Sequence, residues 1–491
     1  MKTTVVQRSS CVLGIDLGTS AIKLAGVSPE GRIVATARES YSTITTCKGQ
    51  AEQDCQHWLI ALTRAAKKVR SRLAPKFRVE AIALTGQMPT LVVLRRDRPI
   101  ANAITWQDSR ADRWVSERLD AGVRRDVYRK TGVIIDGRYL APMFQFHHAA
   151  NWVRADFILS AKDFLFHTLT GVAATDPSTA SGYGLYNLES KSWEAELCKF
   201  WDISAERLPS IRGSTFSAPL SGSGSHMLGC TPGTPVVLGC ADSAAGIYAL
   251  NGGEQCTHTA TILTGSSTVI MKSDSKPHWD AQSRYLVTPL AVDGSYGREA
   301  DLLAGGSARE WAQSVFLQKR SKKTRSAWRA AHDAAPGADG LLFAPYLAGG
   351  EQGVLWNSDL RGTLTGLTLG HNAAQIARAL LEGMSFEIRR CLEIFEEEEP
   401  LSLVRVTGWI TNIPEELQLL ADILRRPVHA LKLASASAIG AALVTGLVDN
   451  KKYFAKTKAV VFTAREQSHL YNEVYARYIE QFPAGSCGKA S

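Results

Sequence analysis

The sequence lacks the paired cysteines that a disulfide framework or a structural zinc site would need. Its nine cysteines occur singly, and none of them forms a Cys-x-x-Cys pair. The chain also has no run of 18 apolar residues that would span a membrane, and its first residues do not resemble a secretory signal. We therefore expect a cytoplasmic protein in a reducing environment, with no membrane partner.

The sequence has little that predicts nucleic-acid binding. Lysine and arginine number 56 against 47 aspartates and glutamates, which gives a formal charge of +9. These basic residues are dispersed and are not interleaved with aromatic residues that would stack on bases. The distribution favours solvated helix faces, so we expect no nucleic-acid partner.

Length and patterning predict an α/β protein of two domains. With 491 residues, 45% of them hydrophobic, the chain has enough material for two separate cores. Strand-like and helix-like segments alternate along it, as in mixed α/β folds. Glycine and serine are concentrated at 210–233. We therefore predict one domain at 1–233 and a second at 234–491.

Three segments carry the clearest helix signals. Asp54 is a candidate N-cap, followed by apolar residues that recur at helical spacing. Asn372 and Gln375 match a capping box at the start of a long apolar-periodic segment. Helices are also expected to dominate residues 139–170.

The segment 12–27, VLGIDLGTSAIKLAGV, predicts a β-hairpin with phosphate-binding parts at its turn. The hydroxyl groups of Thr19 and Ser20, the turn amides and the charge of Lys23 are suited to an anion. Asp16 lies among apolar neighbours at the end of the first strand, where a carboxylate needs a cation or donors, and magnesium would be one. An ordinary hairpin with a solvated turn has the same residues, so both interpretations are open.

A similar pattern recurs at 259–272, TATILTGSSTVIMK. A β-rich run meets Gly265, then hydroxyl residues beginning with Ser266, and then a second β-rich run that ends in lysine. Two such hairpins suggest a duplicated fold in which each half offers one phosphate loop. A nucleotide would then bind between the halves.

Two further segments contain candidate site residues. A strand pattern at 234–239 leads to Asp242 at the start of a predicted helix, where the residue is either only a helix cap or a group near the transferred phosphate. Trp106 and Asp108 end another strand, and an aromatic wall beside polar groups is typical of a sugar or polyol site. A tryptophan that covers the core beside a surface ion pair would fit the second segment equally well.

The order of short motifs along nearly the whole chain resembles the FGGY carbohydrate kinases, the family of xylulokinase, gluconokinase and glycerol kinase. The resemblance implies two actin-like, ribonuclease-H-like domains with a cleft between them, and ATP-dependent phosphorylation of a sugar or polyol hydroxyl group. The motifs that carry it are GIDLGTSAIK at 14–23, AEQD at 51–54, TGQM at 85–88, AITWQDSRA at 103–111, GCADSAAG at 239–246, LTGSS at 263–267, RGTLTGL at 361–367, ARALLEG at 377–383 and LADILRRPV at 420–428.

The resemblance also implies roles for individual residues. It makes Asp242 the general base and a sugar contact, and it gives Asp16 a part in holding magnesium. The residues implied to contact ATP are Thr19, Ser20, Lys23, Gly265, Ser266, Gly306, Glu310 and Gly408. The other residues implied to contact the sugar are Gln87, Met88, Trp106 and Asp108.

The sequence departs from the family pattern at two informative positions. Pro89 stands where xylulokinases usually have a histidine, and Trp409 stands where the family prefers glycine. The leading hypothesis is a xylulokinase-like kinase for a pentulose, with ATP and Mg²⁺ as cofactors. The alternatives are a kinase for another sugar, a sugar acid such as gluconate or a polyol such as glycerol, or a catalytically silent sugar-binding regulator. The family also makes a homodimer possible.

Overall fold

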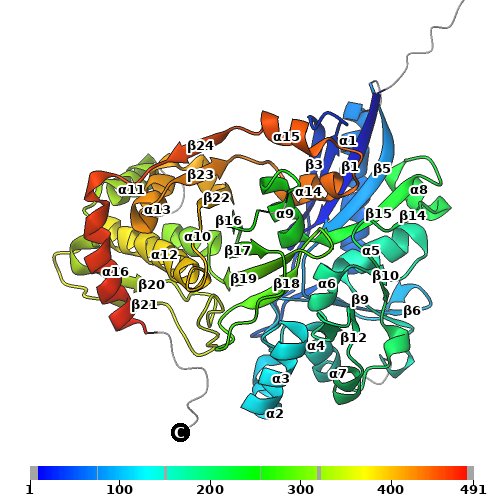
Figure 1. Cartoon of the computed structure of the whole chain (residues 1–491), viewed down its shortest axis with the longest axis horizontal. Helices are drawn as coiled ribbons and strands as arrows, with labels where there is room; N and C mark the ends of the chain where they lie inside the picture. Colours follow the sequence, from blue (N-terminus) through cyan, green and yellow to red (C-terminus); the bar gives the residue numbers. More distant parts are fainter. Residues whose placement is uncertain (1–8, 74–75, 149–151, 255, 318–321, 484–491) are drawn as a thin grey trace, which may run out of the picture.

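Two large mixed sheets form the centre of the molecule in the computed structural model, which describes residues 9–73, 76–148, 152–254, 256–317 and 322–483. Figure 1 shows them side by side, with the strands of the first sheet in blue except the two between residues 217 and 241, which are green. The first sheet has the order β14 (Ser217–Pro219), β15 (Pro235–Ala241), β5 (Phe77–Gly86), β1 (Ser9–Leu17), β2 (Ala21–Val27) and β3 (Ile33–Ser40). The second has the order β18 (Leu286–Pro289), β19 (Tyr296–Leu302), β17 (Thr268–Asp274), β16 (Thr259–Thr264), β22 (Leu403–Gly408), β23 (Val428–Leu431) and β24 (Ala459–Phe462).

The two sheets share one topology, as the repeated hairpins predicted. In the first, the antiparallel strands β1, β2 and β3 continue into β5 and β15, which run parallel to β1. In the second, β16, β17 and β19 are antiparallel, and β22 and β23 run parallel to β16. The expectation of an α/β protein with a duplicated fold is therefore confirmed.

Helices α9 (Asp242–Leu250) and α14 (Ala436–Val444) lie side by side between the two sheets (Figure 1). Small residues allow this close packing. A side chain at Gly14 would place its Cβ 1.8 Å from the Ala438 carbonyl oxygen, and one at Gly440 would come equally close to the Ala245 carbonyl oxygen. The helix α14, late in the chain, thus packs on β1 near the N-terminus and ties the two halves together.

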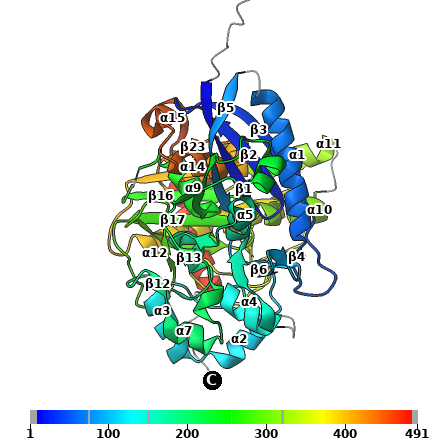
Figure 2. The same cartoon turned by 90° about the vertical axis from the view of Figure 1, so that its right-hand side faces the viewer.

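The first sheet is covered on both faces. Its alternating apolar residues pack against α1 (Cys55–Leu73), α5 (Ala161–Thr170) and α8 (Gly222–Leu228) on one face and against α14 on the other. Figure 2 shows α1 and α14 on opposite sides of β1 and β2. The predicted helix after Asp54 is confirmed as α1.

The second sheet packs against a layer of helices from the second half of the chain. Asn372 and Gln375 form the predicted capping box at the start of the longest helix. The helices of this layer are α10 (Gly306–Val315), α11 (Lys322–Asp333), α12 (Ala373–Phe395), α13 (Pro414–Leu424) and α16 (Leu470–Gln481). The helix α15 (Asn450–Lys456) is not part of this layer and packs near the first sheet. Strands β20 (Leu342–Ala344) and β21 (Thr363–Thr365) form a small separate pair.

A third sheet and several short helices are attached to the first half. The sheet contains β4 (Glu52–Gln53), β8 (Ala103–Thr105), β6 (Thr90–Arg95), β7 (Arg98–Pro99) and β9 (Phe157–Ser160). The helices are α2 (Asp112–Arg118), α3 (Ala121–Thr131), α4 (Leu140–Phe146), α6 (Pro177–Ser181) and α7 (Ala195–Phe200). Strands β10 (Ala174–Thr175) and β13 (Ser210–Ile211) form one short pair, and β11 (Tyr186–Asn187) and β12 (Ser192–Trp193) form another. The expectation that helices dominate 139–170 missed β9, which pairs with β6 in antiparallel register.

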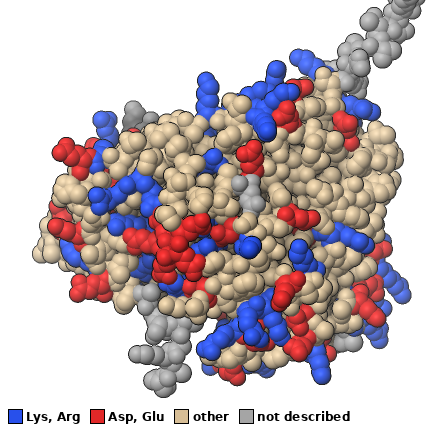
Figure 3. Space-filling model, viewed as in Figure 1, with Lys and Arg blue, Asp and Glu red and all other residues tan. Residues whose placement is uncertain are grey.

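The predicted domain boundary at 233/234 falls just before β15. This strand lies after the boundary in the chain, but it pairs with β5 in the first sheet. No helix among the described residues is long and apolar enough to cross a membrane. Figure 3 shows basic and acidic side chains scattered over this face, with one group of acidic side chains to the left of its centre.

Candidate active site

A cavity of about 160 Å³ lies between the two halves and is lined by both. Thr19 and Trp106 reach it from the first half, whereas Ser267 and Asp301 reach it from the second. Asp242, at the junction of β15 and α9, also lines it. The two hairpin turns and the predicted base therefore face one cavity.

Asp242 is the first residue of α9, and its side chain is free of a capping role. The N-cap is Ala241, and no side chain caps the helix, so the interpretation of Asp242 as only a cap does not hold. The amide of Ser243 donates a hydrogen bond to Asp242 Oδ1 at 2.9 Å. Burial raises the pKa of Asp242 to about 7, and the nearby charge of Asp16 adds to the shift. A carboxylate with this pKa is suited to accept a proton near neutral pH.

A buried polar network fixes the backbone just before Asp242. The amide of Ala241 donates to Ser178 Oγ at 2.9 Å, and Ser178 in turn donates to Asp176. The Nζ of Lys162, a side chain with no solvent exposure, lies 3.1 Å from Asp176 Oδ1. Because buried charges are stable only when they are paired, this network holds one geometry at the end of β15.

Asp16 and Lys23 are paired across the first hairpin. They face each other in the register of β1 and β2, with Lys23 Nζ 3.1 Å from Asp16 Oδ2. The charge of Asp16 raises the pKa of Lys23, which therefore stays protonated. Thr19 lines the cavity, and Ser20 is exposed at the turn. The loop thus combines a cation and hydroxyl groups, as a phosphate site requires.

The residues near this loop fit a magnesium ion. Asp16 is 2% exposed, and its Oδ1 has no hydrogen-bond partner among the described residues. No group of three or more histidine, cysteine, aspartate or glutamate side chains suited to a metal occurs in the described parts of the chain. Magnesium typically keeps water ligands and binds substrate phosphates together with one or two carboxylates, so the Asp16 carboxylate would be enough from the protein for an ion bound with a nucleotide.

The second hairpin turn is closely packed against the start of α10. The Gly265 carbonyl oxygen accepts hydrogen bonds from the amide of Gly306 and from Nε1 of Trp409, each at 3.0 Å. The carbonyl oxygen of Ser266 accepts one from the amide of Gly305 at 2.9 Å. The structure therefore brings together three of the residues assigned to ATP, namely Gly265, Ser266 and Gly306.

The other two residues assigned to the nucleotide side lie in different surroundings. Gly408 has a φ of 101°, and an added Cβ would lie 2.0 Å from the Thr264 carbonyl oxygen, so only glycine fits there. Glu310 is exposed on α10 and does not line the 160 Å³ cavity. Its contact with ATP stays a prediction.

Of the residues assigned to the sugar, Met88 and Trp106 line the cavity, but Gln87 and Asp108 do not. Gln87 is 1% exposed, and its Nε2 donates to Gln53 Oε1 at 3.0 Å. The Nε2 of Gln87 is therefore used to join buried elements of the first half, whereas its buried Oε1 has no hydrogen-bond partner among the described residues.

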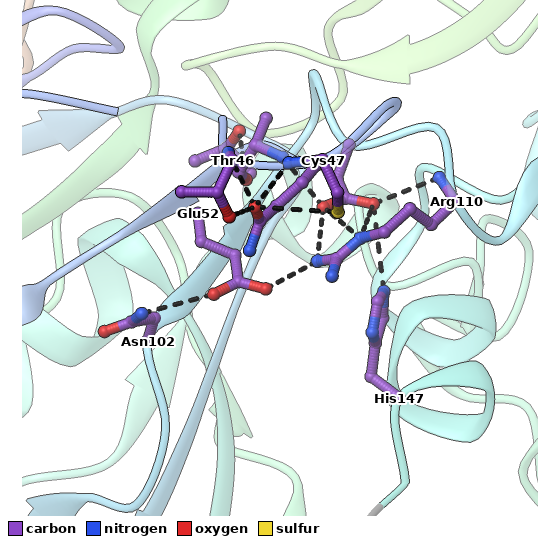
Figure 4. Close-up of polar contacts among 10 residues, drawn as sticks. Thr46, Cys47, Glu52, Asn102, Arg110 and His147 are labelled. Atoms are coloured by element: carbon purple, nitrogen blue, oxygen red, sulfur yellow. Dashed lines mark hydrogen bonds and ion pairs between the residues drawn. The ribbon is translucent and has the colours of Figure 1, made fainter. Parts of the chain in front are cut away.

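Asp108 does not line the cavity and is held in an ion-pair network with Arg110 and His147. Figure 4 shows Arg110 and His147 of this network together with Glu52. Arg110 Nη2 lies 2.6 Å from Asp108 Oδ2 and 2.6 Å from Glu52 Oε1. Burial opposes ionisation, but contacts with His147 and Arg110 hold the pKa of Asp108 well below its usual range. Because Arg110 already uses the carboxylate, a direct sugar contact would require this pair to open.

Sequence analysis missed several polar residues of the cavity: Arg138, Tyr139, Glu299, Asp301 and Gln352. The strand β19 reads YGREADL, and its alternate residues Glu299 and Asp301 face the cavity. Acidic residues at alternate positions of a largely buried strand were a usable signal, because such positions point to one face.

Comparisons with known proteins agree with this geometry. The model of the N-terminal domain of the FGGY family of carbohydrate kinases matches residues 11–249, and the C-terminal domain model matches 260–447. A gluconokinase of Bacillus licheniformis is 26% identical over 466 residues, which cover 90% of this chain and 89% of that protein. A xylulose kinase of Lactococcus lactis is 28% identical over 480 residues, covering 95% of this chain and 94% of that protein.

A solved structure of similar shape supports the same assignment. The gluconate kinase of Lactobacillus acidophilus superposes with a TM-score of 0.89 at 25% identity, covering 98% of this chain and all of that one. Named relatives thus differ in their substrates, but the two domain models together cover most of the sequence. The chain belongs to the FGGY family of carbohydrate kinases, which transfer phosphate from ATP to a sugar.

Proposed function

We propose that this kinase phosphorylates a hydroxyl group of a pentulose, with Asp242 as the general base and ATP with magnesium as the phosphate donor. The observation that carries the proposal is the position of Asp242. It lines a cavity that also contains the tryptophan wall of Trp106, and its pKa is raised to about 7. The wall suits the carbon face of a sugar, and the carboxylate suits its reacting hydroxyl group.

The chain's own residues account for the parts that phosphoryl transfer needs. As the bond between the sugar oxygen and the terminal phosphorus forms and the bond to ADP breaks, the hydroxyl proton passes to Asp242. Lys23 and the amides of the two hairpin turns would hold the phosphates in line. A magnesium ion bound with the nucleotide would neutralise phosphate charge, and Asp16 would help to hold it.

The substrate is tested by ADP release with ATP, magnesium and a panel of pentuloses, hexuloses, aldonates and polyols. We expect turnover that depends on the sugar and is fastest with a pentulose. Faster turnover of a polyol or an aldonate would show that the substrate belongs to that class and is not a pentulose. Sugar binding without ADP release from any compound would instead support a silent sugar-binding regulator.

A further inference from the structure

The three carbonyl groups of the first hairpin turn all accept hydrogen bonds from the first half of the chain. The hydroxyl group of Tyr41 donates to the Gly18 carbonyl oxygen, and the Tyr41 amide donates to that of Ser20 at 3.3 Å. The Thr19 carbonyl oxygen accepts from Gln53 Nε2 at 2.7 Å. The amides of Thr19 and Ser20 donate to no group among the described residues. The turn therefore keeps its amides for a ligand, whereas its carbonyl groups are occupied.

The side chain of Gln53 has no solvent exposure and is held at both ends of its amide group. Its Oε1 accepts hydrogen bonds from Trp58 Nε1 and from Gln87 Nε2, each at 3.0 Å. Its Nε2 donates to Thr43 Oγ1 at 2.8 Å as well as to the Thr19 carbonyl oxygen. Because the indole N–H group of Trp58 can only donate, the end of the amide that faces it must be the oxygen. The nitrogen of Gln53 is therefore the end that faces Thr19.

We propose, resting on the nucleotide site of the function proposed above, that Gln53 is a positioning residue for phosphate binding. The Thr19–Ser20 peptide bond is trans, so its carbonyl oxygen and the Ser20 N–H group point in opposite directions. By holding the Thr19 carbonyl toward the interior, Gln53 turns the Ser20 N–H group to the exposed side of the turn. Without this hydrogen bond the peptide plane is free to rotate. Its carbonyl oxygen, which carries partial negative charge, would then face the phosphate and repel it.

Calorimetry on the full-length protein with magnesium and the β,γ-imido analogue of ATP tests this inference in the absence of any sugar. Gln53→Met keeps the length of the side chain and removes its amide group. We expect this variant to bind the analogue roughly 3- to 10-fold more weakly, which is the effect of one lost hydrogen bond. Adenosine has no phosphate, so its affinity should change by less than about twofold. A merely structural role of Gln53 would weaken the binding of both ligands or of neither.

Trp58→Phe is the matched control. It removes a donor at the other end of the Gln53 amide and leaves the hydrogen bond to Thr19 in place. Since Trp58 is 1% exposed, we expect a lower free energy of unfolding, but binding of the analogue within about twofold of the unmodified protein. If Gln53→Met does not fold, because it leaves the Trp58 N–H group unpaired, the double variant Gln53→Met with Trp58→Phe takes its place. Trp58→Phe is then the reference protein.

Binding and turnover separate this inference from the proposed function. Unchanged binding of the analogue by Gln53→Met, or equal losses for the analogue and adenosine, would overturn the inference and leave the proposed function in place. A loss as large in Trp58→Phe as in Gln53→Met would do the same. A loss confined to the phosphate-bearing ligand would support the inference even if no pentulose were phosphorylated. Failure of the unmodified protein to bind the analogue would overturn both.

Discussion

The indole nitrogen of Trp106 donates a hydrogen bond to the hydroxyl group of Thr19 at 3.0 Å. Trp106 belongs to the wall assigned to the sugar, and Thr19 belongs to the first phosphate loop. Both side chains line the same cavity. The two proposed subsites are therefore joined by a direct contact. A substitution on the sugar side should for this reason also change the binding of ATP.

Trp106→Phe keeps an aromatic wall but removes this donor. Since a hydrogen bond contributes about 0.5–1.5 kcal/mol, we expect the KM values for both sugar and ATP to rise roughly 2- to 10-fold. Steady-state kinetics with each substrate varied in turn measures both. Trp279→Phe, at a residue that is 39% exposed, should change neither value. A rise confined to the sugar would show that the contact does not couple the subsites.

The raised pKa of Asp242 predicts a pH dependence of kcat/KM. The base works only when it is deprotonated, so the value should fall about tenfold per pH unit below about pH 7 and level off above it. The profile is measured with magnesium in excess, so that ionisation of the nucleotide does not contribute. A profile that is flat between pH 5.5 and 8 would contradict this role.

Arg110→Met should destabilise the fold, because it leaves Asp108 and Glu52 without their shared cation. Asp108 is 1% exposed, and breaking a buried pair on one side costs about 3 kcal/mol or more. Urea unfolding measures the loss.

The matched control for this variant is Arg113→Met. It breaks an exposed pair with Glu117, which should cost about 0–1 kcal/mol. Equal losses of stability in Arg110→Met and Arg113→Met would show that the network around Asp108 is as weak as a surface pair.

The stabilisation from Asp108 should also depend on pH. Because the pKa of Asp108 is lowered in the folded state, its stabilisation is present above its unfolded pKa near 4 and is lost as the pH falls through the folded value.

Trp409→Gly should raise the KM for ATP several-fold and leave sugar binding unchanged. The indole donates to Gly265 in the second phosphate loop and is absent from the 160 Å³ cavity. Trp409→Phe, which keeps a ring but loses the N–H group, separates the hydrogen bond from the packing. An effect on the sugar alone would contradict the assignment of this loop to the nucleotide.

Local patterns made much of the fold predictable. The two glycine-turn hairpins, the helix after Asp54 and the capping box at Asn372 each depend on residues close together in the sequence, and each occurs as expected. The place of β15 was not predictable in the same way. Its pairing with β5 depends on a partner about 150 residues away, on the far side of a glycine-rich stretch that looked like a linker.

The candidate site was predictable where chemistry and local structure coincide. Asp242 and Trp106 come at the ends of strand patterns, and both line the cavity. In the sequence, Asp108 looked like a site residue of the same kind as Trp106. In the structure its carboxylate is paired with Arg110, two residues later. The sequence alone does not say which partner a carboxylate has. The alternation of Glu299 and Asp301 along β19 indicated a shared face of the strand, but the sequence did not show that this face lines the cavity, because its direction is set by the pairing of β19 in the sheet.

The most direct test of the account is the turnover of Asp242→Asn compared with the unmodified enzyme, with sugar binding measured on both. We expect kcat to fall by about 10²- to 10⁴-fold, because the amide cannot accept the hydroxyl proton, while the sugar still binds. Unchanged kcat with normal binding would contradict the central claim that Asp242 is the base of this kinase.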